Sequence, residues 1–318
     1  MKIIFIAKHG SGDNDDEGAV AHALRELGHD VTLVHELKRH RDPVQRHDLS
    51  RGTFDLCLFF KWENVGEIGD LSRRVPCVLW YFDLVANDTD PTLAARMRGR
   101  REWFKAVMPY CRAGFVTDGD WADRWNTEAD RKASVVTTPR LHWLTQGMDE
   151  RVAGLGVGIG PGPDILFTGM VHHGRKRADH VARLRERYGD RFHVLGDSGP
   201  RHRLHGRKLA DLFATAGVVV APDGPVTDRY WSNRVYLTCG LGGFLLHPRC
   251  EGLTRQYEPG TELEYYADRR HLEDMINFYL DRSEARTLMK LAGLKATLER
   301  NLYRHRVAEL IKVAEGLL

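Results

Sequence analysis

The sequence has no apolar run long enough to cross a membrane. Its longest apolar stretches, such as residues 218–222 and 244–246, fall far short of the roughly 18 to 20 residues that a bilayer requires. The opening MKIIFIAKHG holds only a short apolar stretch and no small-residue cleavage site, unlike a secretory signal. We therefore expect a cytoplasmic protein with no membrane partner.

Cysteine is scarce. The five cysteines are an odd number, no two form a C-x-x-C pair, and most stand inside apolar stretches. Such a pattern indicates buried thiols in a reducing compartment rather than a disulfide framework.

Several catalytic motifs are also missing. There is no G-x-S-x-G elbow, no P-loop and no H-E-x-x-H, so the common serine hydrolase, P-loop NTPase and zinc protease patterns do not apply. The 16 histidines include His172-His173 and the pair His202 and His205, but no cysteine stands near them. The sequence therefore predicts no metal site.

What the chain does have is material for two hydrophobic cores. At 318 residues, with 42% hydrophobic and 29% charged residues, it is long enough for two globular domains. The net charge is +3, but the first 150 residues carry −3 and the remainder +6. A basic C-terminal half favours binding of an anionic group there.

Short apolar runs alternate with amphipathic segments along both halves, which is typical of parallel sheets covered by helices. We expect two doubly wound, Rossmann-like α/β domains facing a cleft. The predicted boundaries are an acceptor-side domain at 1–152, a Gly/Pro linker at 153–163, a donor-side domain at 164–300, and a C-terminal helix at 301–318 that packs back on the first domain. Predicted strands cover 2–7, 31–34, 54–60, 77–82, 113–116, 134–136, 165–168, 193–195, 218–221 and 243–246, and predicted helices cover 17–27, 179–188, 204–214 and a tail from 272 to 317.

The loop after the first strand, KHGSGDNDDEG, is acidic. Asp15 stands where a dinucleotide fingerprint needs its third glycine, and Asp13, Asp15, Asp16 and Glu17 place four carboxylates where a phosphate would sit. Phosphate binding is excluded here. Two interpretations remain open: a solvated loop whose acids stabilise the helix dipole, or a loop that binds an acceptor.

Four acidic residues follow the ends of N-terminal strands: Asp13, Glu17, Glu63 and Asp83. We rank Asp83 first as a catalytic residue because it follows Trp80-Tyr81-Phe82 at a strand end, with Asp13 and Glu63 behind it. A plain surface turn is the alternative for Asp83. An inverting enzyme needs one of these acids as general base, whereas a retaining enzyme needs only orientation, and the sequence does not choose.

The donor side carries the opposite charge. His172, His173, Arg175, Lys176 and Arg177 follow the strand at 165–168 with no acid before Asp179. Cations at a helix N-terminus oppose the dipole, so we favour a diphosphate site over a solvated helix start.

A second basic point lies at Tyr230 to Pro248. Ser232 or Asn233 can cap a helix whose first turn contains Arg234, which predicts a phosphate clamp.

These last residues belong to a wider resemblance. The stretches SNRVYLTCGLGGFLL (232–246), EGL (251–253), YEPGTE (257–262) and YYAD (265–268) resemble the C-terminal half of CgeB-like, spore-maturation-type glycosyltransferases of the glycosyltransferase-B fold. The ending at 298–310, with Tyr303 and Arg306, resembles the closing helix of that family. The resemblance is specific only over the last hundred residues. A looser match extends to residues 2–7, 78–83 and 164–169.

The resemblance implies a nucleotide-sugar on the second domain. Gly169, Arg175 and Arg177 then contact phosphates, and Ser232, Asn233 and Arg234 lie at the helix start. One departure matters: Leu237 stands where the family has a ribose-binding glutamate, and Arg229 where a related pattern has another. The ribose is then held elsewhere, by Tyr236, Thr238 or Glu251, or the donor is unusual.

The sequence therefore predicts a metal-independent glycosyltransferase, hexosyl or pentosyl, that uses a nucleotide diphosphate-sugar as co-substrate and no cofactor. Two alternatives remain: an acceptor that is a small molecule or polysaccharide, or a non-catalytic nucleotide-sugar-binding protein. The sequence does not indicate an oligomeric state.

The most specific hypothesis concerns the acceptor, a 5-hydroxymethylated pyrimidine such as hydroxymethylcytosine in double-stranded DNA, as in phage-type DNA-modifying glycosyltransferases. Two basic tracts motivate it, one at residues 96–101 and one at 172–208, together with tryptophans able to stack on a base: Trp121, Trp125, Trp143 and Trp231. Against it, the pI near 8.6 is low for a dedicated DNA-binding domain.

Overall fold

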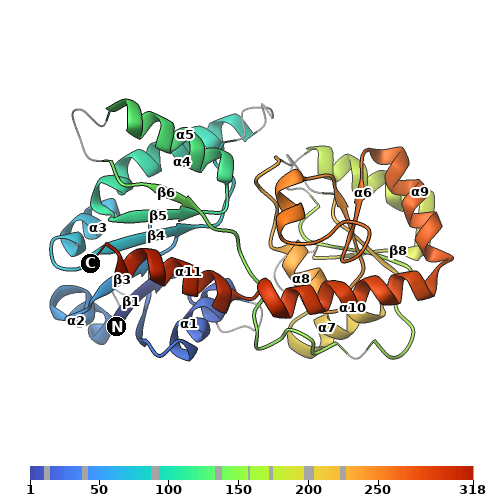
Figure 1. Cartoon of the computed structure of the whole chain (residues 1–318), viewed down its shortest axis with the longest axis horizontal. Helices are drawn as coiled ribbons and strands as arrows, with labels where there is room; N and C mark the ends of the chain where they lie inside the picture. Colours follow the sequence, from blue (N-terminus) through green and yellow to red (C-terminus); the bar gives the residue numbers. More distant parts are fainter. Residues whose placement is uncertain are drawn as a thin grey trace. The chain divides into compact units, whose positions relative to one another are not determined.

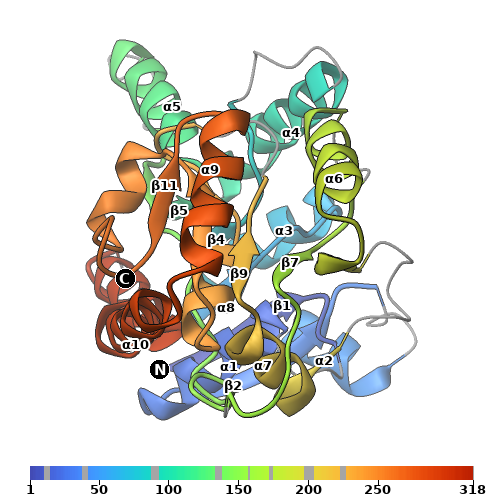
Figure 2. The same cartoon turned by 90° about the vertical axis from the view of Figure 1, so that its right-hand side faces the viewer.

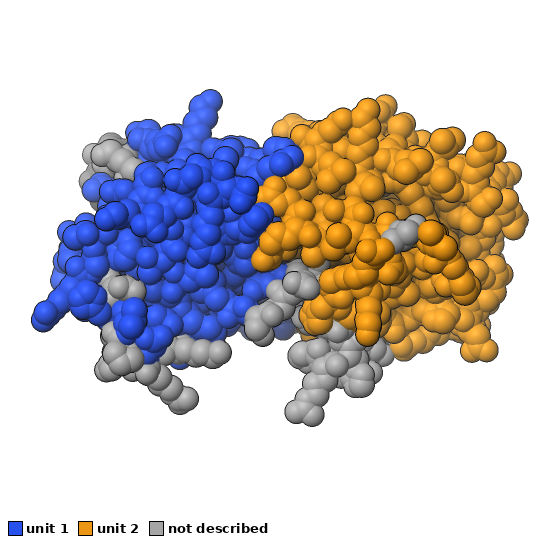
Figure 3. All heavy atoms as spheres, turned by 90° about the horizontal axis from the view of Figure 1, so that it is seen from below, with its two compact units in different colours: residues 1–146, 303–318 blue, residues 147–302 orange. Residues whose placement is uncertain are grey.

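The computed structural model describes residues 1–10, 15–37, 42–86, 93–132, 138–156, 158–171, 175–196, 204–222 and 227–317. The chain divides into two compact units, shown in different colours in Figure 3. Unit 1 comprises Met1–Gln146 and Tyr303–Leu318, and unit 2 comprises Gly147–Leu302. Each is a parallel α/β unit, which confirms the predicted pair of Rossmann-like folds.

Unit 1 is built on a six-stranded parallel sheet of order β2-β1-β3-β4-β5-β6. The four central strands of this sheet are buried on both faces because their residues are almost all apolar. The strands of the sheet span Lys2–Ala7 (β1), Asp30–His35 (β2), Leu56–Phe59 (β3), Cys77–Tyr81 (β4), Ala113–Val116 (β5) and Leu141–Trp143 (β6). The strand order reverses between β1 and β3, where α/β sheets usually bind ligands beyond the carboxyl ends of the strands.

Two sets of helices cover this sheet (Figure 1). One face packs against α1 and α11, and the other against α3, α4 and α5. The helices span Asp16–Glu26 (α1), Pro43–Arg51 (α2), Val65–Ser72 (α3), Ala94–Val107 (α4), Gly119–Lys132 (α5) and Tyr303–Glu315 (α11).

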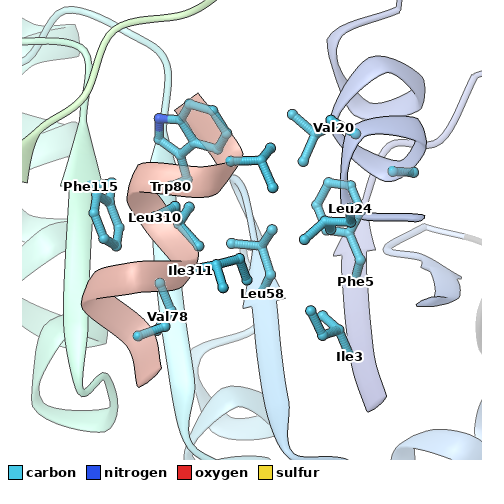
Figure 4. Packing of buried hydrophobic residues seen from close by; sticks show 14 of the residues in the cluster. Ile3, Phe5, Val20, Leu24, Leu58, Val78, Trp80, Phe115, Leu310 and Ile311 are labelled. Atoms are coloured by element: carbon cyan, nitrogen blue, oxygen red, sulfur yellow. The ribbon is translucent and has the colours of Figure 1, made fainter. Parts of the chain in front are cut away.

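The last helix, α11, completes the core of unit 1. Figure 4 shows Leu310 and Ile311 packed over the sheet beside Leu58 and Val78. Polar contacts fix the start of the helix: Tyr303 donates its hydroxyl to Asp16 Oδ1 at 2.7 Å, and Arg306 Nε donates to Thr145 Oγ1 at 3.1 Å. The first and last segments of the chain are therefore parts of one folded unit.

Unit 2 has a five-stranded parallel sheet of order β11-β10-β9-β7-β8. Helices α6 and α9 contribute to the apolar core on one face, and α8 packs against α10 on the other (Figures 1 and 2). The strands span Ile165–Thr168 (β7), Phe192–Leu195 (β8), Val218–Val220 (β9), Leu245–Pro248 (β10) and Glu264–Tyr266 (β11), and the helices Arg175–Tyr188 (α6), Gly206–Thr215 (α7), Arg234–Gly240 (α8), Arg269–Leu280 (α9) and Ser283–Arg300 (α10).

The Gly/Pro stretch at 153–163, expected to be a linker, lies inside unit 2. A Cβ atom on Gly156 would stand 2.7 Å from the carbonyl oxygen of Ala210, and one on Gly162 would stand 2.5 Å from that of Thr215. These glycines therefore allow the segment to lie directly on α7. The chain passes from unit 1 to unit 2 earlier, at residues 146 and 147.

The predicted strands can be compared with those of the structure. The strands predicted at 2–7, 113–116 and 165–168 are confirmed residue for residue. The strand expected at 134–136 lies outside the described residues. The short strand β11 was not predicted, because its sequence Glu-Tyr-Tyr lacks an apolar run.

No helix in the described part of the chain is long and apolar enough to span a membrane. All five cysteines are described, and they are buried without a disulfide between them.

Candidate functional site

The carboxyl ends of β7 and β8 in unit 2 are formed by two glycines. Gly169 has a φ of +133° and Gly196 a φ of +99°, conformations that side chains rarely allow. Gly169 N donates to Leu195 O at 2.8 Å, and a Cβ on Gly196 would lie 3.4 Å from Gly169 N. The two strand ends therefore meet as bare backbone, which a ligand can approach closely.

Arg234, the first residue of α8, is fixed at this point. Its Nε donates to Thr168 O at 2.7 Å, and its guanidinium carbon lies 5.1 Å from the centre of the Phe167 ring. A Cβ on Gly169 would stand 2.6 Å from its terminal nitrogen Nη2. The glycine thus makes room for a positively charged group directly at the strand end.

Arg177, in the first turn of α6, reaches the same segment. Its Nη1 donates to Met170 O at 3.2 Å, and the residue is only 7% exposed. Two of the predicted phosphate-binding arginines are thus anchored on Thr168–Met170, next to Gly169. Arg175 begins α6, but its side chain, like His172 and His173, lies outside the described part.

The remaining donor-side candidates divide into two groups. Asn233 occupies the N-cap position of α8, and Ser232 O accepts from Val235 N at 3.2 Å, so both stand at the helix start beside Arg234. Asn233 does not provide the predicted side-chain cap, since its side chain makes no capping hydrogen bond to the helix.

Tyr236 and Thr238 lie in the interior instead, at 1% and 0% exposure. The Tyr236 hydroxyl accepts from Trp231 Nε1 at 3.0 Å. Glu251, the other residue considered for the ribose, is exposed and pairs with Arg249 at 2.7 Å.

In unit 1, Asp83 follows β4 and is held between two cations. Its Oδ2 accepts from Arg100 Nη2 at 2.9 Å and also pairs with Lys61 Nζ. Glu63 is exposed just before α3, and Asp13 lies outside the described residues. The structure thus places Asp83 in an ion-paired cluster.

A pair of carboxyl groups, Asp15 and Glu17, starts α1. Asp15 caps the helix, with Oδ1 accepting from Glu17 N at 3.1 Å and Oδ2 from Gly10 N at 3.0 Å. Burial and the hydrogen bond to Asp15 raise the pKa of Glu17 to about 9. Burial opposes ionisation of Asp15 too, but hydrogen bonds from Glu17 and backbone N–H groups outweigh it and hold its pKa below the usual value. Glu17 therefore carries a proton at neutral pH and shares it with Asp15.

His9 lies beside this pair at the end of β1. Its Nε2 lies 3.0 Å from Phe5 O, and burial lowers its pKa. Because a carbonyl oxygen only accepts hydrogen bonds, Nε2 of His9 carries a proton and donates it to Phe5 O.

Asp118, two residues after β5, organises a loop. Its Oδ2 accepts from the backbone N of Val85 and of Ala86, each at 2.7 Å, and its Oδ1 from Trp121 N at 3.1 Å. Burial raises its pKa, and these bonds oppose the rise. Asp118 thus anchors the segment after β4, which contains Asp83, to the start of α5.

Across the described ranges, no three His, Cys, Asp or Glu residues are grouped so that they could hold a metal ion.

Comparison with known proteins agrees with this architecture. Residues 175–312 match the family model described as glycosyl transferase-like. No curated protein matches the chain in sequence.

Among solved structures, sucrose-phosphate synthase from Thermosynechococcus elongatus matches with a TM-score of 0.68 at 13% identity, over 100% of this chain and 99% of that one. Trehalose 6-phosphate synthase from Burkholderia multivorans matches at 0.65 and 11% identity, over 100% of both chains. Anabaena HepE in complex with UDP matches at 0.58 and 10% identity, over 99% of this chain and 100% of that one.

The chain has the glycosyltransferase-B fold, and its C-terminal part is glycosyl transferase-like in sequence. The match is to this broader family, so the CgeB-like subclass stays a prediction.

Proposed function

We propose that the protein is a glycosyltransferase that moves a sugar from a nucleotide diphosphate-sugar to an acceptor hydroxyl. One observation carries the donor half: Arg234 is held by Thr168 O beside the bare backbone of Gly169, with Arg177 anchored one residue further on. Positive charge at the carboxyl end of a strand suits a diphosphate. The glycosyl transferase-like match and the UDP complex of Anabaena HepE support this assignment.

In this reaction the bond between the sugar C1 and the diphosphate oxygen breaks, and a bond from the acceptor oxygen to C1 forms. Negative charge grows on the diphosphate as it leaves. Arg234 and Arg177 stabilise that charge without a metal ion, because their guanidinium groups are already in place before the reaction. Ser232 and Asn233 are proposed to complete the phosphate contacts, whereas Tyr236 and Thr238 are buried and offer little surface to a ribose.

The acceptor proton passes either to a protein base or to the departing phosphate. Asp83 is our first candidate for the acceptor side. Its partners Arg100 and Lys61 hold the carboxylate in a fixed position, which suits orientation of a hydroxyl. Asp13 and Glu63 remain second candidates.

The test is calorimetric titration of the full chain with UDP, ADP, GDP and their sugars. We expect saturable binding of one nucleotide series, and we expect Arg234→Ala to weaken it by about 10- to 100-fold, the usual effect of losing a charged hydrogen-bond donor. Arg191→Ala is the matched control: this exposed arginine pairs with Asp164 at 2.6 Å at the opposite, amino-terminal edge of the same sheet. Equal binding by both variants would rule out the Arg234 site.

Turnover separates the enzyme from a non-catalytic binding protein. Donor hydrolysis or transfer to any acceptor in a screen supports the enzyme, and product NMR then decides between inversion and retention. Tight donor binding with neither reaction would favour the binding protein.

A hydroxymethylated pyrimidine in DNA is a second, more specific acceptor to test. Arg96 and Arg98 are exposed on α4, as phosphate contacts require, but Arg100 and Arg101 bond to the segment after β4, and Trp121 and Trp231 are buried. Labelled sugar transfer to duplexes with 5-hydroxymethylcytosine or 5-hydroxymethyluracil tests it. A small-molecule or polysaccharide acceptor is the alternative outcome.

A further inference from the structure

Helix α10 exposes an apolar stripe on its outer face. Leu288 is 63% exposed and Leu291 60% exposed, although both are leucines in the middle of a helix of 18 residues. Glu284 lies four residues before Leu288, and Lys295 lies four residues after Leu291, and both are exposed. The spacing of 4, 3 and 4 residues puts all four on one side of the helix, and we call them the α10 stripe.

The stripe is not part of the core of unit 2. The inner face of α10 is formed by Met289, Gly293, Ala296 and Thr297, which are buried, and the helix packs there against α8. The backbone approaches closely on that side, since a Cβ on Gly293 would stand 2.5 Å from Glu262 O. The inner contacts thus hold α10 in place and leave the stripe exposed. Helix α10 itself lies at the edge of unit 2 in Figures 1 and 2.

The order of the residues along the stripe is acid, leucine, leucine, base. A second copy of the same helix, turned antiparallel about a two-fold axis midway between Leu288 and Leu291, puts each Leu288 opposite Leu291 of the other helix. The same operation puts each Glu284 opposite Lys295. The stripe is therefore complementary to itself, as an isologous two-fold contact requires.

A parallel arrangement lacks this match. A parallel pairing in register puts Glu284 against Glu284 and Lys295 against Lys295, which is repulsive. Within one chain Lys295 Nζ lies 3.8 Å from Glu299 Oε1, in a pair with side chains 74% and 56% exposed. Such an exposed pair contributes little, so it does not prevent Lys295 from pairing across the axis.

We propose that the α10 stripe is a docking surface for a second copy of this chain, joined by an antiparallel α10–α10 contact. The stripe is only about three helical turns long, so the contact buries less area than a standard stable interface. The expected dimer is therefore weak, with a Kd on the order of tens of micromolar. The contact is independent of the proposed donor site.

Sedimentation velocity of the full chain from about 1 to about 200 µM tests this, because that range brackets the expected Kd. The parent should shift from monomer to dimer, and the double variant Leu288→Ala/Leu291→Ala should stay monomeric. Leu37→Ala is the matched control: Leu37 is 65% exposed in unit 1, and its loss should leave dimerisation unchanged. Circular dichroism checks that each variant is folded.

A charge swap distinguishes this contact from any other apolar association. Glu284→Lys and Lys295→Glu should each raise the dimer Kd by about fivefold or more, because each creates two like-charge contacts across the axis. The double swap Glu284→Lys/Lys295→Glu restores opposite charges and should return the Kd to about the parent value. A parent that stays monomeric, a dimer indifferent to the leucines, or a double swap no better than the single ones would overturn the proposal.

Discussion

The environment of Gly169 depends on the absence of a side chain. Its φ of +133° strains any other residue, and a Cβ atom would collide with Arg234, which is itself fixed by Thr168 O. A substitution here therefore acts in two ways, on the strand end and on the arginine proposed to bind phosphate.

We predict that Gly169→Ala weakens nucleotide binding by about tenfold and also lowers the free energy of unfolding by about 1 to 3 kcal/mol. Calorimetry and urea unfolding measure the two effects. Gly260→Ala is the control, because Gly260 has a φ of +78° but no atom within 4 Å of a would-be Cβ. It should lose stability without losing nucleotide affinity. Unchanged nucleotide binding by Gly169→Ala would show that Arg234 does not contact the nucleotide.

The second prediction concerns the proton held by Glu17. Its pKa of about 9 in the folded chain lies above the ordinary value of 4.5, so between these pH values the folded state keeps a proton that the unfolded state has lost. Stability from this group is complete below about pH 4.5 and declines as the pH rises toward 9. The lowered pKa of Asp15 acts in the opposite direction, but only at lower pH.

Glu17→Gln removes this titration and keeps an N–H donor for Asp15. Between about pH 5.5 and pH 8.5 the variant should gain at least about 1 kcal/mol of unfolding free energy relative to the parent. Urea unfolding at both pH values measures the difference. Glu26→Gln, an exposed acid at the end of the same helix, should show no such gain. Parallel pH profiles for parent and Glu17→Gln would contradict the shared proton.

For single residues, the sequence predicted the roles that follow from residue type and from position at the end of a strand or helix. Gly169, Arg177 and Arg234 stand at strand or helix ends with few alternatives, and the structure brings them together. The buried contacts of Tyr236, which the sequence offered as a ribose candidate, and of Asp118 could not be predicted from residue type and position. Tyr236 points inward to Trp231, and Asp118 bonds to a loop more than thirty residues earlier. Neither contact leaves a local pattern.

Among the elements, the strands were the most predictable. Short apolar runs flanked by glycine or proline, such as Ile-Leu-Phe-Thr in β7, indicate central strands, whereas β11 is short and polar at its start. The Gly/Pro stretch was expected to be a linker, but it lies within unit 2. Glycine permits a flexible backbone, and it equally permits a backbone to lie close against a helix. The sequence alone does not distinguish the two.

Two glycine substitutions, with opposite expected effects on stability, test the close approach of the Gly/Pro stretch to α7. Gly156→Ala puts a Cβ 2.7 Å from Ala210 O and 2.8 Å from Leu241 O, so it should destabilise unit 2 by about 1 to 3 kcal/mol. Gly99→Ala, in the middle of α4 with no atom within 4 Å, should stabilise unit 1 by about 0.5 to 1 kcal/mol. Thermal unfolding checks both. A neutral Gly156→Ala would show that the stretch is not held against α7.

For the whole molecule, the important feature is that unit 1 includes a helix from the far end of the chain. Five hydrophobic side chains of α11 are buried in the core of unit 1: Tyr303, Val307, Leu310, Ile311 and Ala314. Their removal would expose the face of the sheet that contains Trp80 and Leu58.

A chain that stops after Leu302 should therefore lose most of the cooperative stability of unit 1, since burial of each large side chain contributes about 1.5 to 3 kcal/mol. Hydrogen exchange read by mass spectrometry should show β1 and β3 unprotected and β7 and β9 still protected. Removal of residues from Gly316 onward is the control, because Gly316 and Leu317 are exposed. Full protection of β1 after loss of α11 would contradict this account.

The same connectivity sets an order of events during synthesis. Residues 147–302 form a unit from one continuous stretch, so every part of it has been translated before α11 exists. The first 146 residues leave the ribosome long before the helix that covers their sheet. We therefore expect unit 2 to finish folding first. Until α11 has been synthesised, one apolar face of the sheet in unit 1 is incompletely covered. Folding of unit 2 before unit 1 reverses the usual N-to-C order of domain folding.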